Sequence, residues 1–156
     1  MNIGIIGQGF VGSAVREGLK NFYNLKTYDV DKEKCTDTHE EICKWADIIF
    51  VCVPTPMEKS GECDISILRQ ALFDLDRGVS SYANHRPTVV IKSTVPPGTT
   101  AKLQTLCDHV DLCFSPEFLT EANSFEDFKN QSRIIIGGEN ARRIKQMFSC
   151  LLYTSP

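Results

Sequence analysis

Long hydrophobic runs and an excess of positive charge are both missing from this sequence. The longest uninterrupted apolar run is residues 48–53, far shorter than the ~20 residues of a membrane-spanning helix. Lysine and arginine number 17 against 20 aspartate and glutamate, a formal net charge of -3, so the composition offers no electrostatic footprint for nucleic acid or an anionic membrane. The chain also starts in a strand candidate without a charged and then apolar leader. These absences predict a cytoplasmic protein that binds neither nucleic acid nor membrane.

The sequence also lacks the cysteine spacings of a disulfide framework or a zinc site. Its seven cysteines are odd in number and contain no C-x-x-C pair, which argues against both. The one cluster worth weighing is Cys107, His109 and Cys113, which would meet only if the intervening turn were tight. Structural zinc normally takes four ligands at a recognisable spacing, so we predict no metal site.

Strand and helix patterns alternate along the whole chain. Its 156 residues, 42% of them hydrophobic, suffice for one domain. Thr-His-Glu-Glu at residues 38–41 predicts a capping box that opens a helix. The strand candidates are residues 2–6, 25–29, 47–53, 88–92, 112–114 and 133–136. We therefore expect an α/β protein with a doubly wound Rossmann fold, whose mostly parallel six-stranded sheet binds ligands at the carboxyl ends of its strands.

A glycine fingerprint follows the first strand candidate. Gly7, Gly9 and Gly12 have the G-x-G-x-x-G spacing: the first permits a tight turn, the second lets the backbone approach a pyrophosphate, and the third lets helix and strand pack closely. Phe10 and Val11 lie between them and are expected at the cofactor. The following helix should bury one face, which consists of Val11, Ala14, Val15, Leu19 and Phe22.

Asp29 closes the second strand candidate, 17 residues after Gly12. A carboxylate there can accept hydrogen bonds from both hydroxyls of an adenosine ribose and would repel a 2'-phosphate, so NAD is favoured over NADP. The alternative is an ordinary glycine turn followed by a capping aspartate. Because strand, turn, helix, strand and acid occur in register, we predict a dinucleotide site.

Three polar segments follow later strands and should line the same edge of the sheet. In Val-Pro-Thr-Pro at residues 53–56, two prolines would hold the Thr55 hydroxyl near the dinucleotide, although a rigid turn explains the segment equally well. Thr94 ends the fourth strand, where its hydroxyl could hold a water or a substrate oxygen. Glu117 and Glu121 are four residues apart, which on a helical turn would place both carboxylates on one face. Such a pair beside a cofactor is a candidate for proton transfer, and a solvated acidic turn is the alternative.

Five segments occur in the order seen in one protein family. They are the glycine fingerprint, Val-Pro-Thr-Pro, Ser-Thr-Val-Pro-Pro-Gly-Thr from Ser93, Pro-Glu-Phe-Leu-Thr-Glu-Ala from residue 116, and Arg-Ile-Ile-Ile-Gly from residue 133. In this respect residues 1 to about 150 resemble the UDP-glucose/GDP-mannose dehydrogenase family, in particular its UDP-glucose 6-dehydrogenase branch. The resemblance implies an NAD-dependent, two-step oxidation of the primary alcohol of a nucleotide sugar, of the UDP-glucose or GDP-mannose type, to a carboxylate.

The resemblance also implies roles for individual residues. Glu117 would assist proton transfer and water activation, Thr94 would hold the water, and Glu121 would support the nicotinamide side. Lys34 falls where a basic side chain of the family reaches the adenosine ribose, though a solvated lysine is an equal alternative. The remaining implied contacts are Val53, Pro54, Thr55 and Ser93 with the cofactor, and Phe118 and Leu119 with the sugar nucleotide.

The sequence departs from the family pattern in several places, among them Gln131 and Ser132, which replace the usual proline-containing approach to Arg133. Only 21 residues separate Asp29 from Val51, so a segment common in the family is missing or reduced, and Thr120 stands where a basic residue is common. No segment of these 156 residues matches the central helix of the family with its Lys and Asn, or the second domain with its nucleophilic Cys. We therefore expect residues 1–150 to form an NAD-binding Rossmann domain with a truncated tail at 151–156, inactive alone, and a homodimer only if the full protein contains the central helix.

Two other functions remain open from the sequence. The chain could be a stand-alone nucleotide-binding subunit whose site is completed by a partner. It could also be a different Rossmann dehydrogenase that oxidises an alcohol in one step, with Thr94 and a lysine from elsewhere.

Overall fold

Five parallel strands form the centre of the protein in a computed structural model, which describes residues 1–82, 84–138 and 140–152. The strands are β1 (Asn2–Ile6), β2 (Asn24–Tyr28), β3 (Ile48–Val51), β4 (Thr88–Ile91) and β5 (Asp111–Phe114). Their order in the sheet is β2-β1-β3-β4-β5, and all four pairings are parallel. The order reverses direction at β1, and ligands of open α/β sheets bind at such a switch point, outside the carboxyl ends of the strands.

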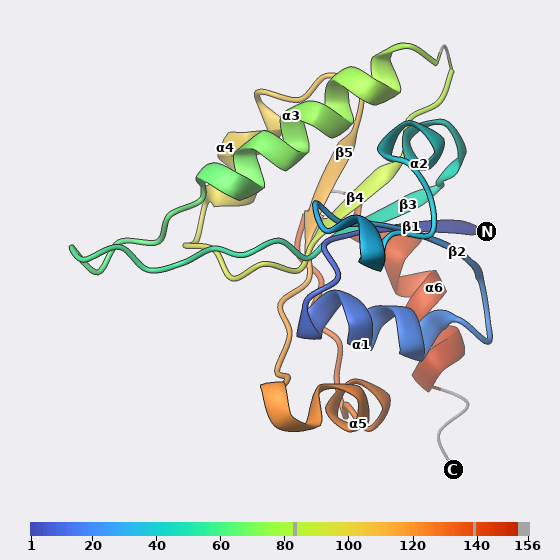
Figure 1. The fold of residues 1–156 in the computed structure, drawn as a ribbon, viewed down its shortest axis with the longest axis vertical. Coiled ribbons are helices and arrows are strands. Elements are labelled where there is room, and N and C mark those ends of the chain that lie inside the picture. The colour runs from blue at the N-terminus through green and yellow to red at the C-terminus, as the bar shows by residue number, and fades with distance from the viewer. Residues whose placement is uncertain (83, 139, 153–156) are drawn as a thin grey trace.

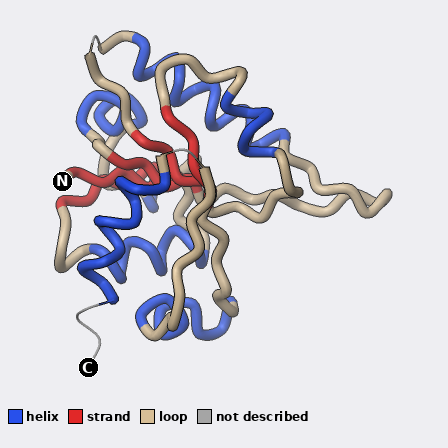
Figure 2. The backbone as a smooth tube through the Cα atoms, turned by 180° about the vertical axis from the view of Figure 1, so that it is seen from behind, coloured by secondary structure: helices blue, strands red, loops and turns tan. Residues whose placement is uncertain are grey.

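Helices cover both faces of this sheet. They are α1 (Phe10–Leu19), α2 (His39–Trp45), α3 (Ser66–Ser80), α4 (Thr99–Gln104), α5 (Ser124–Lys129) and α6 (Ala141–Leu152), with short 3-10 turns at η1 (Lys32–Lys34) and η2 (Glu121–Asn123). Helices α2, α3 and α4 lie on one face, and α1, α5 and α6 lie on the other (Figures 1 and 2). The doubly wound Rossmann-like architecture expected from the alternation is therefore confirmed.

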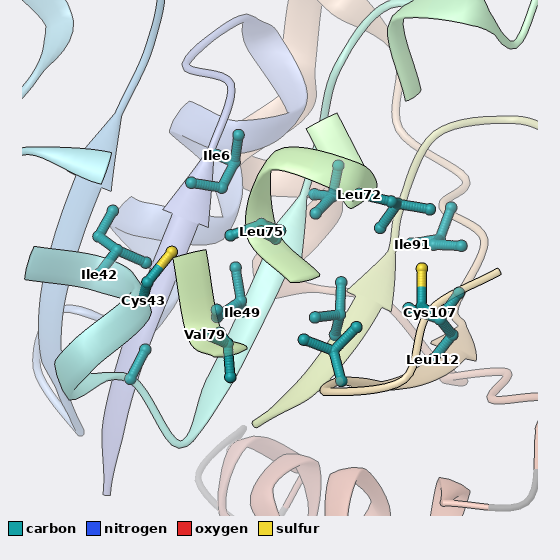
Figure 3. Close-up of a cluster of buried hydrophobic side chains, with 14 of the residues drawn as sticks. Ile6, Ile42, Cys43, Ile49, Leu72, Leu75, Val79, Ile91, Cys107 and Leu112 are labelled. Carbon is teal, nitrogen blue, oxygen red and sulfur yellow. The ribbon is translucent and has the colours of Figure 1, made fainter. Parts of the chain in front are cut away.

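Each face of the sheet has its own apolar core. On the α2–α4 face, Leu72 and Leu75 of α3 pack over Ile49 of β3 (Figure 3). On the other face, Phe50 packs edge-on against Phe148, with ring centroids 6.0 Å apart. All four residues of β3 are buried, as expected for a parallel strand covered on both sides. Each fully buried Leu, Ile or Phe side chain contributes roughly 1.5–3 kcal/mol of transfer free energy.

The expected sixth strand is absent from the described residues, so the prediction of six strands was wrong. Residues 133–136 run past the free edge of β5 without a ladder. Gly137 alone pairs with Phe114, through two antiparallel backbone hydrogen bonds of 2.8 Å. Ile134 and Ile136 pack against the core while Ile135 is exposed. This alternation gave the strand signal, although the backbone reaches β5 at only one residue.

Of two local predictions about the helices, the capping box of α2 is right and the extent of the buried face of α1 is wrong. The capping box at α2 is confirmed, because Thr38 Oγ1 accepts from the Glu41 amide and the Glu41 carboxylate accepts from the Thr38 amide. Phe22 does not belong to the buried face of α1, because that helix ends at Leu19 and the Phe22 side chain is 45% exposed. None of the helices in the described part of the chain has the length and apolar character needed to cross a membrane.

Candidate functional site

The glycine turn between β1 and α1 has the conformation that its spacing predicts. Gly7 has φ +90°, and a Cβ there would lie 2.7 Å from the Cys52 carbonyl oxygen. A Cβ on Gly12 would overlap the Gly7 carbonyl oxygen, so helix and turn touch directly. Around Gly9, by contrast, a Cβ would meet no atom within 4 Å. The backbone at Gly9 is thus open to an approaching group, while Gly7 and Gly12 serve the tight turn and the close packing.

Asp29, just past the end of β2, is fixed beside this turn. Its Oδ2 accepts a hydrogen bond of 2.6 Å from the Gln8 amide, and its Oδ1 accepts one of 2.9 Å from the Asp31 amide. The Gly7 amide donates to the Tyr28 carbonyl at 2.8 Å, which ties the turn to the end of β2. Each carboxylate oxygen keeps a further acceptor site, so Asp29 is held ready to accept from two neighbouring hydroxyls.

One cleft of about 1370 Å³ runs along the carboxyl ends of the strands. Most residues that the sequence placed at the cofactor or in catalysis line it: Gly7, Gly9, Phe10, Val11, Asp29, Lys34, Val53, Pro54, Thr55, Ser93, Thr94 and Glu117. Four of the predicted residues do not line the cleft: Gly12, Phe118, Leu119 and Glu121. Small-molecule sites usually occupy ~300–1,000 Å³, so the cleft has room for an extended ligand such as a dinucleotide.

Two hydroxyls in this cleft tie neighbouring strand ends together. Thr55 Oγ1 donates to the Thr94 carbonyl at 2.7 Å, and Ser93 Oγ donates to the Val53 carbonyl at 2.6 Å. The Thr55 hydroxyl therefore fixes the backbone of the adjacent loop. The Thr94 side chain is exposed in the cleft, where a ligand oxygen can reach it.

Glu117, past the end of β5, projects into the cleft from a half-buried position. Its Oε2 is buried and has no hydrogen-bond partner among the described residues. Burial raises the pKa of the Glu117 carboxyl to about 7, and the positive charge of Lys92 opposes this increase. A carboxyl with a pKa near the working pH is suited to proton transfer.

Lys92 was not recognised from the sequence as part of the site. It follows β4 directly, is 4% exposed, and lines the cleft. Burial lowers the pKa of its ammonium, while Cys52 and Glu117 act in the opposite direction. The available signal was a lysine directly after the apolar strand at residues 88–91, because lysine is almost never fully buried without a partner.

The structure does not bring Glu117 and Glu121 onto one helical face. Residues 115–120 contain no helical turn, Thr120 is extended at φ -92° and ψ 143°, and Glu121 begins η2 as an exposed residue. The predicted carboxylate pair was wrong, because the backbone at Thr120 is extended, with its amide and hydroxyl both donating to the Asp127 carboxylate, and this interrupts the i,i+4 geometry that such a pair requires.

Of the other predicted contacts, Lys34 lines the cleft, whereas Phe118 and Leu119 do not. Phe118 is 60% exposed, and the Arg133 guanidinium lies over its ring at 5.8 Å. Leu119 packs against the core that contains α1, α5 and α6. The Lys34 ammonium forms an ion pair with the Asp31 carboxylate at 3.7 Å. A ligand that bound Lys34 would therefore compete with Asp31 for its ammonium.

Cys107, His109 and Cys113 do not meet. Cys107 and Cys113 are buried in the cores on opposite faces of the sheet, and His109 Nδ1 lies 3.2 Å from the Asp76 carboxylate. Across the described residues, no group of three or more His, Cys, Asp or Glu side chains is arranged to hold a metal ion.

A parallel sheet with a glycine turn, an acid at the end of β2 and one cleft along the strand ends defines a Rossmann-type dinucleotide-binding domain. The chain belongs to the UDP-glucose/GDP-mannose dehydrogenase family, since its residues 16–154 match the NAD binding domain of that family.

A relative named UDP-glucose 6-dehydrogenase agrees with this assignment. The chain is 34% identical to UDP-glucose 6-dehydrogenase of Rickettsia bellii over 76% of its length and 27% of the relative's length. It is 31% identical to an uncharacterised protein of Methanocaldococcus jannaschii over 93% of its length and 19% of that protein. A solved UDP-glucose dehydrogenase from Pyrobaculum islandicum has the same fold, with a TM-score of 0.82 and 24% identity, over 99% of this chain and 44% of that one. The chain thus spans less than a third of the length of the Rickettsia bellii and Methanocaldococcus jannaschii relatives, and less than half of the solved chain.

Proposed function

We propose that this chain is the NAD-binding portion of a nucleotide-sugar 6-dehydrogenase, of the type that converts UDP-glucose to UDP-glucuronate. The observation that carries the proposal is a single cleft that contains both Asp29, fixed beside the glycine turn, and Glu117, whose pKa is raised to about 7. One end of the cleft suits an adenosine ribose, and the other offers a group for proton transfer.

The chain's residues fit NAD in three respects. The backbone at Gly9 is open on the side where a Cβ would project, which suits the close approach of a pyrophosphate. Asp29 would accept hydrogen bonds from the ribose hydroxyls and repel a 2'-phosphate. Phe10, Val11, Val53, Pro54 and Ser93 would contact the cofactor, and Lys34 would reach its ribose. Bound NAD would supply the hydride acceptor.

The remaining side chains would serve the oxidation. Glu117 would accept the proton that leaves the alcohol, because a pKa of about 7 keeps both its acid and its carboxylate forms populated near neutral pH. Thr94 would hold a water or substrate oxygen. Phe118 and Leu119 would contact the sugar nucleotide through their backbone, and Glu121 would support the nicotinamide side.

The thiol for a second oxidation step is not supplied by this cleft. Two-step oxidation to a carboxylate proceeds through a covalent thiohemiacetal and thioester, which require a thiolate. Among the described residues, Cys52 is the cysteine that lines the cleft, and burial raises its pKa to about 12, so it stays protonated. We propose that residues outside this chain supply the nucleophile, and that the isolated chain binds NAD without oxidising UDP-glucose.

Calorimetric titration with NAD and NADP tests the proposal. The chain should bind NAD and discriminate against NADP, and Asp29→Asn should weaken that discrimination because the repulsion of the 2'-phosphate is lost. Glu33→Gln is a matched control, since it removes a carboxylate in η1 that is exposed and does not line the cleft. Absence of NAD binding, or equal affinity for NADP in the unaltered chain, would overturn the proposal.

A further inference from the structure

The least expected feature of the cleft is the buried lysine at its floor. The Lys92 Nζ donates to the Pro116 carbonyl at 3.2 Å, and this is the hydrogen bond that the structure shows for it. Burying an ammonium is costly unless charged or polar groups compensate for the lost water. Packing alone therefore does not explain why a lysine occupies this buried position.

Three titratable groups face the Lys92 ammonium from the neighbouring strands. They are Cys52 after β3, Cys113 in β5, and Glu117 past β5. Burial raises the pKa of both thiols to about 12, so they stay neutral. Glu117 is the member of this group that can change its charge near neutral pH.

The hydrogen bond to Pro116 connects Lys92 to the backbone directly before Glu117. Pro116 directly precedes Glu117 in a segment without helical hydrogen bonds, and the Glu117 Oε2 is buried with no hydrogen-bond partner among the described residues. Elsewhere in the segment, the Thr120 amide and hydroxyl both donate to the Asp127 carboxylate, at 2.8 and 2.7 Å. Lys92 thus anchors the start of the segment, next to the carboxyl whose placement matters.

We propose that Lys92 is a positioning residue, whose buried ammonium holds the Pro116 carbonyl and keeps the Glu117 carboxyl in the cleft in a form that can accept a proton. The inference rests on the proposed function, in which Glu117 accepts the proton of the alcohol. Without a nearby cation, burial would favour the neutral acid, and a neutral acid cannot act as a base. With the ammonium present, the anionic form persists at neutral pH.

NMR titration of the Glu117 side-chain carboxyl carbon in the labelled chain tests this role. The titration midpoint should lie near 7 in the unaltered chain and should rise by about one pH unit or more in Lys92→Met, because the favourable charge is lost. Lys92→Arg should keep most of the effect. Lys102→Met is the matched control, since Lys102 is exposed on α4 and does not line the cleft. An unchanged midpoint in folded Lys92→Met would overturn the inference.

A reciprocal variant covers the case in which Lys92→Met does not fold. In Glu117→Gln, the titration midpoint of the Lys92 ammonium should fall, because coupling between two sites acts equally in both directions. A midpoint that stays in place would overturn the inference. NAD binding by the unaltered chain is measured separately: its absence would defeat the proposed function, whereas the two titrations still decide whether Lys92 controls Glu117.

Discussion

Two alanine substitutions in the same glycine fingerprint should have opposite consequences. In Gly12→Ala the new Cβ would overlap the Gly7 carbonyl oxygen and lie 2.9 Å from its carbonyl carbon. Both are backbone atoms, and Gly7 is itself held by its hydrogen bond to the Tyr28 carbonyl. Overpacking of this kind costs roughly 1–3 kcal/mol, while the better helix propensity of alanine offsets up to about 1 kcal/mol. Because the overlap is with fixed backbone atoms, the cost lies at the upper end of this range, and the expected net loss of about 2 kcal/mol corresponds to a fall in Tm of about 4 to 8 °C in a domain of this size.

Gly9→Ala is the matched comparison. Gly9 has φ -70° and ψ -164°, which alanine adopts readily, and its Cβ would meet nothing within 4 Å. Stability should change by less than about 0.5 kcal/mol. NAD affinity should nevertheless fall about tenfold or more, because the methyl group stands where the backbone would approach the pyrophosphate. Thermal denaturation and NAD calorimetry on both variants provide the data. A Gly12→Ala chain with unchanged Tm, or a Gly9→Ala chain with unchanged NAD affinity, would refute the reasoning.

Three further outcomes follow from single contacts. Glu117 has a raised pKa in the folded chain, so its contribution to stability is present below its unfolded pKa and is lost as the pH rises through about 7. In urea titrations from pH 4 to 8, Glu117→Gln should therefore gain stability relative to the unaltered chain as the pH rises, and a constant difference would contradict this. Thr38→Ala removes the α2 cap and should cost about 1 kcal/mol by urea denaturation; no loss would mean that the capping box adds nothing. Phe128→Ala empties a buried site of α5 against Gly18 of α1 and should cost about 3 to 5 kcal/mol in the same assay, whereas a loss below 1 kcal/mol would show that the site collapses.

Features that depend on neighbouring residues were predictable from the sequence. The conformations at Gly7 and Gly12 follow from local backbone requirements, and the capping box of Thr38 and Glu41 follows from spacing within one helical turn. Asp29 was found by its position at a strand end, and the hydrogen bond from the Gln8 amide places it beside the turn. In each case the feature is set by atoms within one β-α-β unit or one helical turn, although Gly7 also packs against the Cys52 carbonyl after β3.

Two of the errors concern contacts that lie beyond the local sequence pattern. Alternating burial at Ile134 and Ile136 looked like a strand, yet pairing with β5 depends on where the chain returns, and only Gly137 reaches Phe114. Likewise, the spacing of Glu117 and Glu121 suggested one helical face, but the Thr120 amide and hydroxyl are held by Asp127 and the segment stays extended. Periodicity reports which way side chains face and does not report which backbone lies opposite.

The strand order explains why one half of the cleft was easier to predict than the other. Strands β2 and β1 are adjacent in both the sequence and the sheet, so the Gly7 turn and Asp29 are assembled by one local unit. The other half gathers the ends of β3, β4 and β5, which bring Cys52, Lys92 and Glu117 together across 65 residues of sequence. The charge state of Glu117 is set by burial and by Lys92, and neither can be deduced from the residues beside it. Cofactor selectivity should therefore respond to substitutions around Asp29, while proton transfer should respond to substitutions on three separate strand ends.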